Sequence, residues 1–184
     1  MTANMNGINR EFEKLERKKQ KLMQSIVSLT EDRYHTHPSP ESWSVAKAAN
    51  HIFLSEQLSL AYLKKKLSYP DTVPPFHIKS WGAVLLIKLV LWTRYKRKAP
   101  KAINMWEQQT ILSMAELDQQ WRILRIELYA FIEKHQLSFG THLAYNHPFA
   151  GRMTMHQMLI FLNDHLEHHL KQVDRIINMN TKVT

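Results

Sequence analysis

The seven prolines of this 184-residue chain all fall between long stretches that have helical periodicity. Because proline costs about 3 kcal/mol inside a helix, each one marks a break. No alternation of strand period, internal repeat or low-complexity tract of useful length is visible. The chain is therefore predicted to be all-α. The breaks lie at Pro38, Pro40, Pro70, Pro74, Pro75, Pro100 and Pro148.

Apolar residues recur in steps of three and four along five stretches, each of which is a predicted helix. Ser44 and Thr154 are the expected N-caps of two of them, because their side-chain oxygens can accept hydrogen bonds from the first turn. Such steps on several long helices are typical of a four-helix bundle, here expected as one domain over residues 1–184. The stretches run from about Gly7 to Leu29, Ser44 to Leu67, Ser80 to Arg97, Trp106 to His135 and Thr154 to Asn178.

Composition excludes several classes of protein. The chain has no cysteine, so it has no disulfide, no thiolate metal ligand and no cysteine nucleophile. Its first ten residues are polar and contain no apolar core of a secretory signal, so the cytoplasm is the expected compartment. The net charge of +9 permits attraction to nucleic acid or anionic lipid. Nucleic-acid binding is disfavoured, because no nucleic-acid motif is visible and the basic residues of the first helix alternate with acidic ones.

The run from Trp81 to Trp92 is strongly apolar, but about 20 such residues are needed to cross a bilayer. Its hydrophobicity is not confined to one face, which favours a buried or lid-like helix covering one end of the bundle. The alternative is an interfacial helix, in which residues 80–98 contact a membrane surface and the basic end after Tyr95 meets anionic lipid.

Two histidines of the last predicted helix, His165 and His169, are four residues apart and therefore lie on one face, one turn from each other. They continue its apolar stripe of methionine, leucine, valine and isoleucine, so they are predicted to point inward. His168 shares its face with Asp164 and Lys171 and is predicted to point to solvent. Buried imidazoles need partners, because unpaired polar groups cost free energy.

His51, in the second predicted helix, is the best candidate for a third inward histidine. Ala48 and Ser55, one turn on either side, are small and leave room for an ion. Three inward histidines favour a metal site over hydrogen-bonded core histidines, which remain the alternative. Trp43 is interpreted as an anchor packed under the second helix rather than as a substrate platform.

Three groups of residues, in this order along the chain, make the sequence similar to a known family. They are Trp43-Ser44-Val45 with His51 eight positions after the tryptophan, then His147-Pro148 with Gly151 and Thr154, then His165-x-x-x-His169 followed by Gln172. With these motifs the chain resembles the DinB/YfiT-like family of metal-dependent proteins. The resemblance implies a four-helix bundle with a long crossover between core helices 2 and 3. The extra apolar helix would be an elaboration of that crossover.

The resemblance also implies a divalent metal site at His51, His165 and His169, with zinc or nickel as first candidates and iron or manganese open. Three histidines leave a coordination position free. Several family members resemble transferases of low-molecular-weight thiols such as bacillithiol or mycothiol. The expected partners are therefore a small-molecule substrate, a low-molecular-weight thiol and a second copy of the chain in a homodimer. The alternatives are a hydrolase that uses metal-bound water, and a non-enzymatic basic helical protein that binds nucleic acid or a membrane surface.

Overall fold

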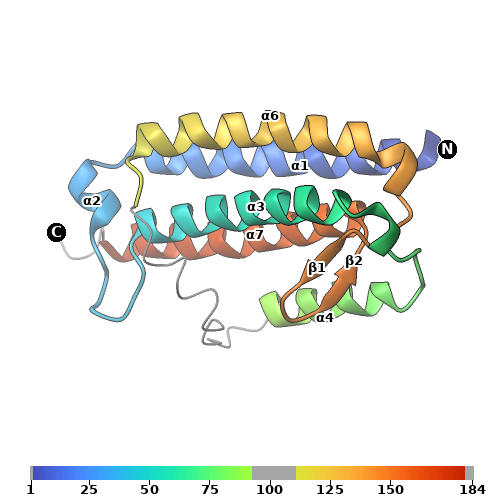
Figure 1. The fold of residues 1–184 in the computed structure, drawn as a ribbon. Coiled ribbons are helices and arrows are strands. Elements are labelled where there is room, and N and C mark those ends of the chain that lie inside the picture. The colour runs from blue at the N-terminus through green and yellow to red at the C-terminus, as the bar shows by residue number, and fades with distance from the viewer. Residues whose placement is uncertain (1, 93–110, 181–184) are drawn as a thin grey trace.

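Four long helices form a bundle in the computed structural model, which describes residues 2–92 and 111–180. Helices α1 and α6 lie side by side over α3 and α7 (Figure 1). Contacts between α1 and α7 and between α3 and α6 close the ring. The predicted all-α four-helix bundle is confirmed. Its helices are α1 (Thr2–Val27), α3 (Val45–Leu67), α6 (Met114–Phe139) and α7 (Met155–Asn180).

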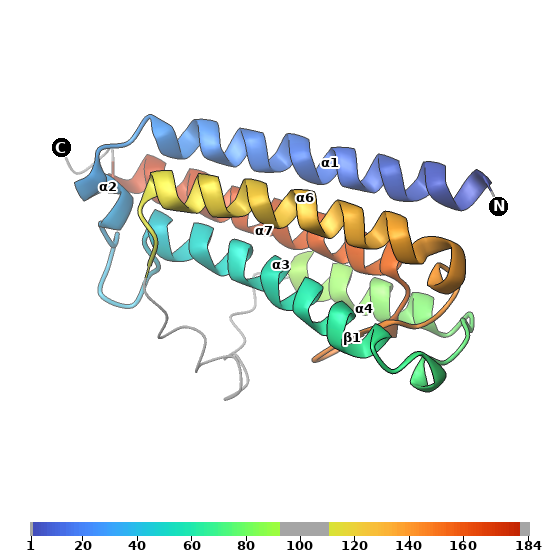
Figure 2. The same ribbon diagram turned by 45° about the horizontal axis from the view of Figure 1, so that its top comes forward.

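A long crossover joins α3 to α6. It contains the short helix η1 (Pro70–Thr72) and helix α4 (Ser80–Trp92), and it returns the chain to the end of the bundle at which α3 begins. As a result α3 and α6 run in the same direction, while α1 and α7 run in the opposite one (Figure 2). The expected crossover between the second and third core helices, with an added apolar helix, is therefore present.

The helix starts follow from capping side chains. Ser44 Oγ accepts a hydrogen bond from the backbone N–H of Lys47, and Thr154 Oγ1 accepts one from that of Gln157, as predicted. The predicted start of the fourth helix near Trp106 is wrong over the described residues 111–113. These residues are not helical, because Ser113 and Glu116 form a capping box that begins α6 at Met114. Residues 93–97 and 106–110 of the predicted helices lie outside the described residues.

A short helix and a two-stranded hairpin were missed by the sequence analysis. Helix α2 (Glu31–His35) has only five residues, and the antiparallel strands β1 (Tyr145–His147) and β2 (Gly151–Met153) have three each. Such lengths are too short for a periodic pattern. At Gly151 the backbone φ is +89°, a conformation that residues with a β-carbon rarely adopt. This glycine lets the chain turn back into β2 just before α7 begins.

A buried network of charges crosses the core beside its leucines. Glu56 of α3 is 1% exposed and accepts two hydrogen bonds from Arg125 of α6, Nε to Oε2 at 2.6 Å and Nη2 to Oε1 at 2.7 Å. The indole Nε1 of Trp121 also donates to Glu56 Oε2, at 2.8 Å. Arg125 Nη1 donates to Glu16 of α1 at 2.7 Å. The network thus ties three of the four bundle helices together.

Helix α4 packs along α7 and against β2 through one apolar face. Ala83, Val84 and Ile87 are buried there, whereas Leu85 and Leu89 on the other face are about half exposed or more. Helix α4 is therefore buried on one face only and lies along α7, rather than being buried or covering one end of the bundle, and its expected apolar character on more than one face is confirmed. Among the described residues, no helix is both long and apolar enough to cross a membrane.

Candidate metal centre

The candidate site lies between α3 and α7. His165 and His169 are one turn apart on α7, and His51 faces them from α3, which packs along α7. His169 is 7% exposed, and His51 and His165 are half-buried. The register argument therefore holds for all three residues, because the structure brings together the three side chains predicted from the sequence.

The Nε2 atoms of the three imidazoles converge on one point. His51 Nε2 lies 3.2 Å from His165 Nε2, and His169 Nε2 lies 3.1 Å from His165 Nε2. One nitrogen from each ring falls within a single group no more than 4.8 Å across. In a tetrahedral zinc site with Zn–N bonds of about 2.05 Å, ligand nitrogens are about 3.3 Å apart. The spacing of these nitrogens therefore fits one divalent ion.

Burial keeps the three imidazoles neutral. It lowers the pKa of His51 to about 4 and that of His169 to about 3, and it holds the pKa of His165 well below its ordinary value. The neighbouring histidines and Lys47 reinforce these shifts, because nearby positive charge disfavours protonation. A metal ion binds the neutral form of imidazole, so the site presents its ligands in the required state at neutral pH.

Gln172, three residues after His169 on α7, fixes the orientation of the His169 ring. His169 Nδ1 lies 2.7 Å from Gln172 Oε1, and an amide oxygen can only accept, so Nδ1 carries the proton. The lone pair of His169 then lies on Nε2, which is the atom that faces the other two histidines. Hydrogen bonds of this kind set the tautomer and position of metal-binding histidines.

A family model of the DinB superfamily matches residues 14–173. The matched region contains all three converging histidines and the motifs on which the resemblance was based. The chain belongs to the DinB superfamily. Comparison with curated proteins and with solved structures gave no significant match.

Trp43 forms one wall of the site in this DinB-superfamily chain, which the sequence analysis did not predict. Its ring stacks on His169 with centroids 5.9 Å apart and an interplanar angle of 4°, and it packs against His51 at 5.0 Å. The side chain also packs against the hydrophobic core, so its predicted anchoring role is only part of its contacts. The ammonium group of Lys47 lies over the Trp43 ring, with Nζ 5.3 Å from the ring centroid.

His168 lies outside the cluster of nitrogens, as the register predicts, but it does not point freely to solvent. It is half-buried, and its Nδ1 donates a hydrogen bond to the carbonyl oxygen of Leu91 in α4 at 2.8 Å. One turn earlier on the same face, Asp164 pairs with Lys88 of α4 at 3.8 Å. The prediction was wrong because the sequence did not reveal that α4 covers this face of α7.

Aromatic rings surround His165 on the side of the hairpin. Phe161 stacks on His165 with centroids 5.5 Å apart and meets His147 of β1 edge-on at 4.6 Å. Burial lowers the pKa of His147 to about 4. Its Nδ1 accepts hydrogen bonds from the backbone N–H groups of Phe149 and Ala150. His147 therefore holds the hairpin turn and supports the aromatic wall without joining the three converging histidines.

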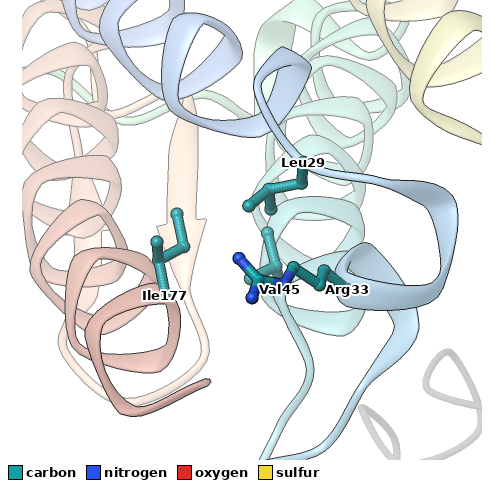
Figure 3. A pocket seen from close by; sticks show the side chains of 4 residues that line it. All are labelled: Leu29, Arg33, Val45 and Ile177. Carbon is teal, nitrogen blue, oxygen red and sulfur yellow. The ribbon is translucent and has the colours of Figure 1, made fainter. Parts of the chain in front are cut away.

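Two hollows of the described structure lie away from the three histidines. A narrow one, of about 10 Å³, has room for roughly one water molecule and lies where α2 meets the start of α3 and the end of α7 (Figure 3). Its lining is Leu29, Arg33, Val45 and Ile177. The second, a groove of about 360 Å³ between α3 and α6, is lined by residues such as Phe53, Leu60 and Ile123. Phe53 and Leu60 lie on a different face of α3 from His51, so the groove is not the mouth of the candidate site.

Proposed function

We propose that this protein is a metal-dependent enzyme that transfers a low-molecular-weight thiol to an electrophilic small molecule. The convergence of the Nε2 atoms of His51, His165 and His169 is the observation that carries the proposal. Membership of the DinB superfamily is compatible with a metal-dependent enzyme. Zinc or nickel is the first candidate for the ion, since imidazole suits both.

The donor set leaves a position for a reactant. Three protein ligands are typical of catalytic sites, whereas structural zinc sites have four. Among the described residues, no carboxylate, cysteine or further histidine joins the three histidines as a fourth ligand. When bound, the ion supplies positive charge that lowers the pKa of a coordinating thiol. This favours the thiolate, which is the nucleophilic form.

One feature favours thiol transfer over hydrolysis. Because the chain has no cysteine, the thiol itself would come from a cosubstrate. The largest electrostatic influences on the three imidazoles come from Lys47 and other histidines, and no carboxylate is among them. A hydrolase needs a general base to activate water, for which a carboxylate is a usual choice. The positive charge of Lys47 beside His51 instead favours an anionic sulfur.

The residues of the chain divide the remaining work. Gln172 holds the His169 ring in the orientation that directs Nε2 to the centre of the site. Trp43 and Phe161 cover two sides of the imidazoles with apolar surface, which limits access of water to the site. Lys47 adds positive charge beside His51, which complements an anionic thiol.

The metal requirement is tested by elemental analysis of purified protein. We expect a near-stoichiometric divalent ion in the wild type and its loss in His51→Ala, His165→Ala and His169→Ala. His168→Ala is the matched control and should keep the ion, because its ring bonds to Leu91 rather than to the cluster. Equal loss of metal in all four variants would contradict the assignment of ligands.

The reaction is tested by a titration of small thiols at fixed metal concentration. Metal-loaded protein should accelerate transfer of the thiol to an electrophile, and chelated protein should not. Acceleration that rises with thiol supports the proposal. Inhibition of ester or amide cleavage by the thiol would instead indicate a hydrolase, in which the thiol occupies the open position.

A further inference from the structure

The outer face of α4 carries a continuous apolar stripe that no described element covers. Its side chains are from 45% to 79% exposed, and most of them recur in helical steps of three and four. The opposite face of α4 is buried against α7 and β2. Helix α4 lies on the flank of the bundle away from α1 and α6, so the stripe faces outward (Figure 1). The stripe consists of Trp81, Leu85, Leu86 and Leu89 of α4, and it is extended by Ile78, two residues before the helix begins.

The sequence that contains this stripe carries charge of one sign. Between Asp71 and Glu107 the sequence contains no acidic residue, and it contains seven lysines and arginines. This stretch therefore carries +7 of the net charge of +9. Within the described part, Lys79 is exposed beside the stripe, and Lys88 stands on α4 itself with its side chain 53% exposed. Within the described residues, Lys88 pairs with Asp164 of α7.

We propose that the outer face of α4 docks this protein on an anionic lipid surface. A helix that lies in the plane of the interface buries an apolar face at the boundary of the acyl chains, while cations beside it meet the headgroups. The stripe supplies the apolar face, and Lys79 and Lys88 supply charge at its edges. Helix α4 has 13 residues, which suits a helix lying on a membrane rather than crossing it.

The charge argues against two other occupants. In a dimer formed through α4, Lys79 and Lys88 of the two copies would be brought together and repel. Nucleic acid would be attracted by the cations, but a stripe made largely of leucine and isoleucine offers nothing to phosphates and little to bases. An anionic membrane satisfies both the apolar and the charged parts. This docking is independent of the reaction at the histidine cluster.

The proposal is tested by co-sedimentation of the full chain with vesicles of phosphatidylcholine alone or with about one third phosphatidylglycerol. We expect binding to the anionic vesicles that weakens at about 0.5 M salt, where screening is within roughly 4 Å. The variant Leu85→Gln/Leu89→Gln should bind about tenfold or more weakly. The matched control is Ile123→Gln/Ile126→Gln on α6, whose side chains are similarly exposed, and it should bind like the wild type.

A charge pair and a fluorescence readout complete the test. Lys79→Glu should weaken binding by about thirtyfold, since each unit of charge contributes about fivefold, whereas Lys65→Glu on α3 should have much less effect. Circular dichroism of each variant confirms that it folds. Vesicles should shift the tryptophan emission to the blue, and Trp81→Phe should reduce that shift.

Several results would overturn the proposal. One is absence of binding to anionic vesicles, and another is equal loss of binding in the α4 and α6 double variants. A vesicle-induced blue shift that persists unchanged in Trp81→Phe would show that this face stays in water. A wild-type dimer in light scattering that Leu85→Gln/Leu89→Gln dissociates would assign the stripe to a second copy. Duplex DNA that competes fully with the vesicles would assign the charge to nucleic acid.

Discussion

Removing the guanidinium of Arg125 is expected to lower the free energy of unfolding more than almost any other single change to a polar side chain. Arg125→Met preserves the apolar stem of the residue but deletes both of its hydrogen bonds to Glu56 and the one to Glu16. The Glu56 carboxylate is 1% exposed, so water cannot replace the lost donors. Only the indole N–H of Trp121 still bonds to it.

The magnitude follows from this burial. Breaking a buried ion pair by removing one partner costs about 3–5 kcal/mol, because the other charge stays buried and uncompensated. Domains of this size are stable by about 5–15 kcal/mol in total. A change of about 4 kcal/mol lowers Tm by roughly 10–15 °C at about 2–4 °C per kcal/mol. Glu56→Gln in the Arg125→Met background should restore about 2 kcal/mol, since it removes the stranded charge.

The assay is urea unfolding of metal-free protein at neutral pH, followed by circular dichroism. Arg122→Met is the matched control, because its side chain is 70% exposed and pairs with Asp118 on the surface of the same helix. Such an exposed pair contributes little to stability, because water screens it. The reasoning is wrong if Arg125→Met and Arg122→Met differ by less than about 1 kcal/mol, or if Glu56→Gln makes Arg125→Met less stable still.

Three further predictions concern the site and the turn before α7. The metal-free protein should lose stability as pH falls from 6.5 toward 4, because the histidines take up protons in the unfolded chain, whereas buried His51 and His169 stay neutral in the folded one. Each of the two should lower the free energy of unfolding by about 2 kcal/mol at pH 5, and equal stability at pH 7 and pH 5 would contradict this. Gln172→Leu should weaken metal affinity about 10–100-fold in a competitive titration, with Gln172→Glu largely retaining it. Gly151→Ala should cost about 1–2 kcal/mol because its φ is +89°, whereas Gly82→Ala in α4, where a β-carbon meets nothing within 4 Å, should be neutral or stabilising in the same unfolding assay.

The bundle could be predicted because its helices are long and their apolar residues repeat regularly. Trp121 and Leu128 fall on one such stripe, and both are fully buried. The capping residues Ser44 and Thr154 were visible for the same reason, since each precedes a clear periodic run. The convergence of His165 and His169 follows from their spacing alone, and that of His51 follows from the small residues on either side of it.

Other features depend on contacts that no local pattern reveals. Glu56 and Arg125 have the charged side chains of surface residues, and only the packing of α3 on α6 buries them together. Trp43 reaches His169 because the segment before α3 brings it to α7, which is distant in sequence. The hairpin strands are too short to show alternation, and Pro148 and Gly151 at its turn were the local signs of a change in direction.

His168 shows how the crossover alters the meaning of a sequence pattern. On an isolated amphipathic helix, a histidine that shares its face with Asp164 and Lys171 belongs to solvent. In the folded chain α4 lies along that face, so His168 bonds to Leu91 and Asp164 pairs with Lys88. Helix α7 therefore uses one face for the candidate metal ligands and the adjacent face to hold α4. His168→Ala remains a sound control for metal binding, because what it removes is a contact between α7 and α4 and not a nitrogen that faces the centre of the site.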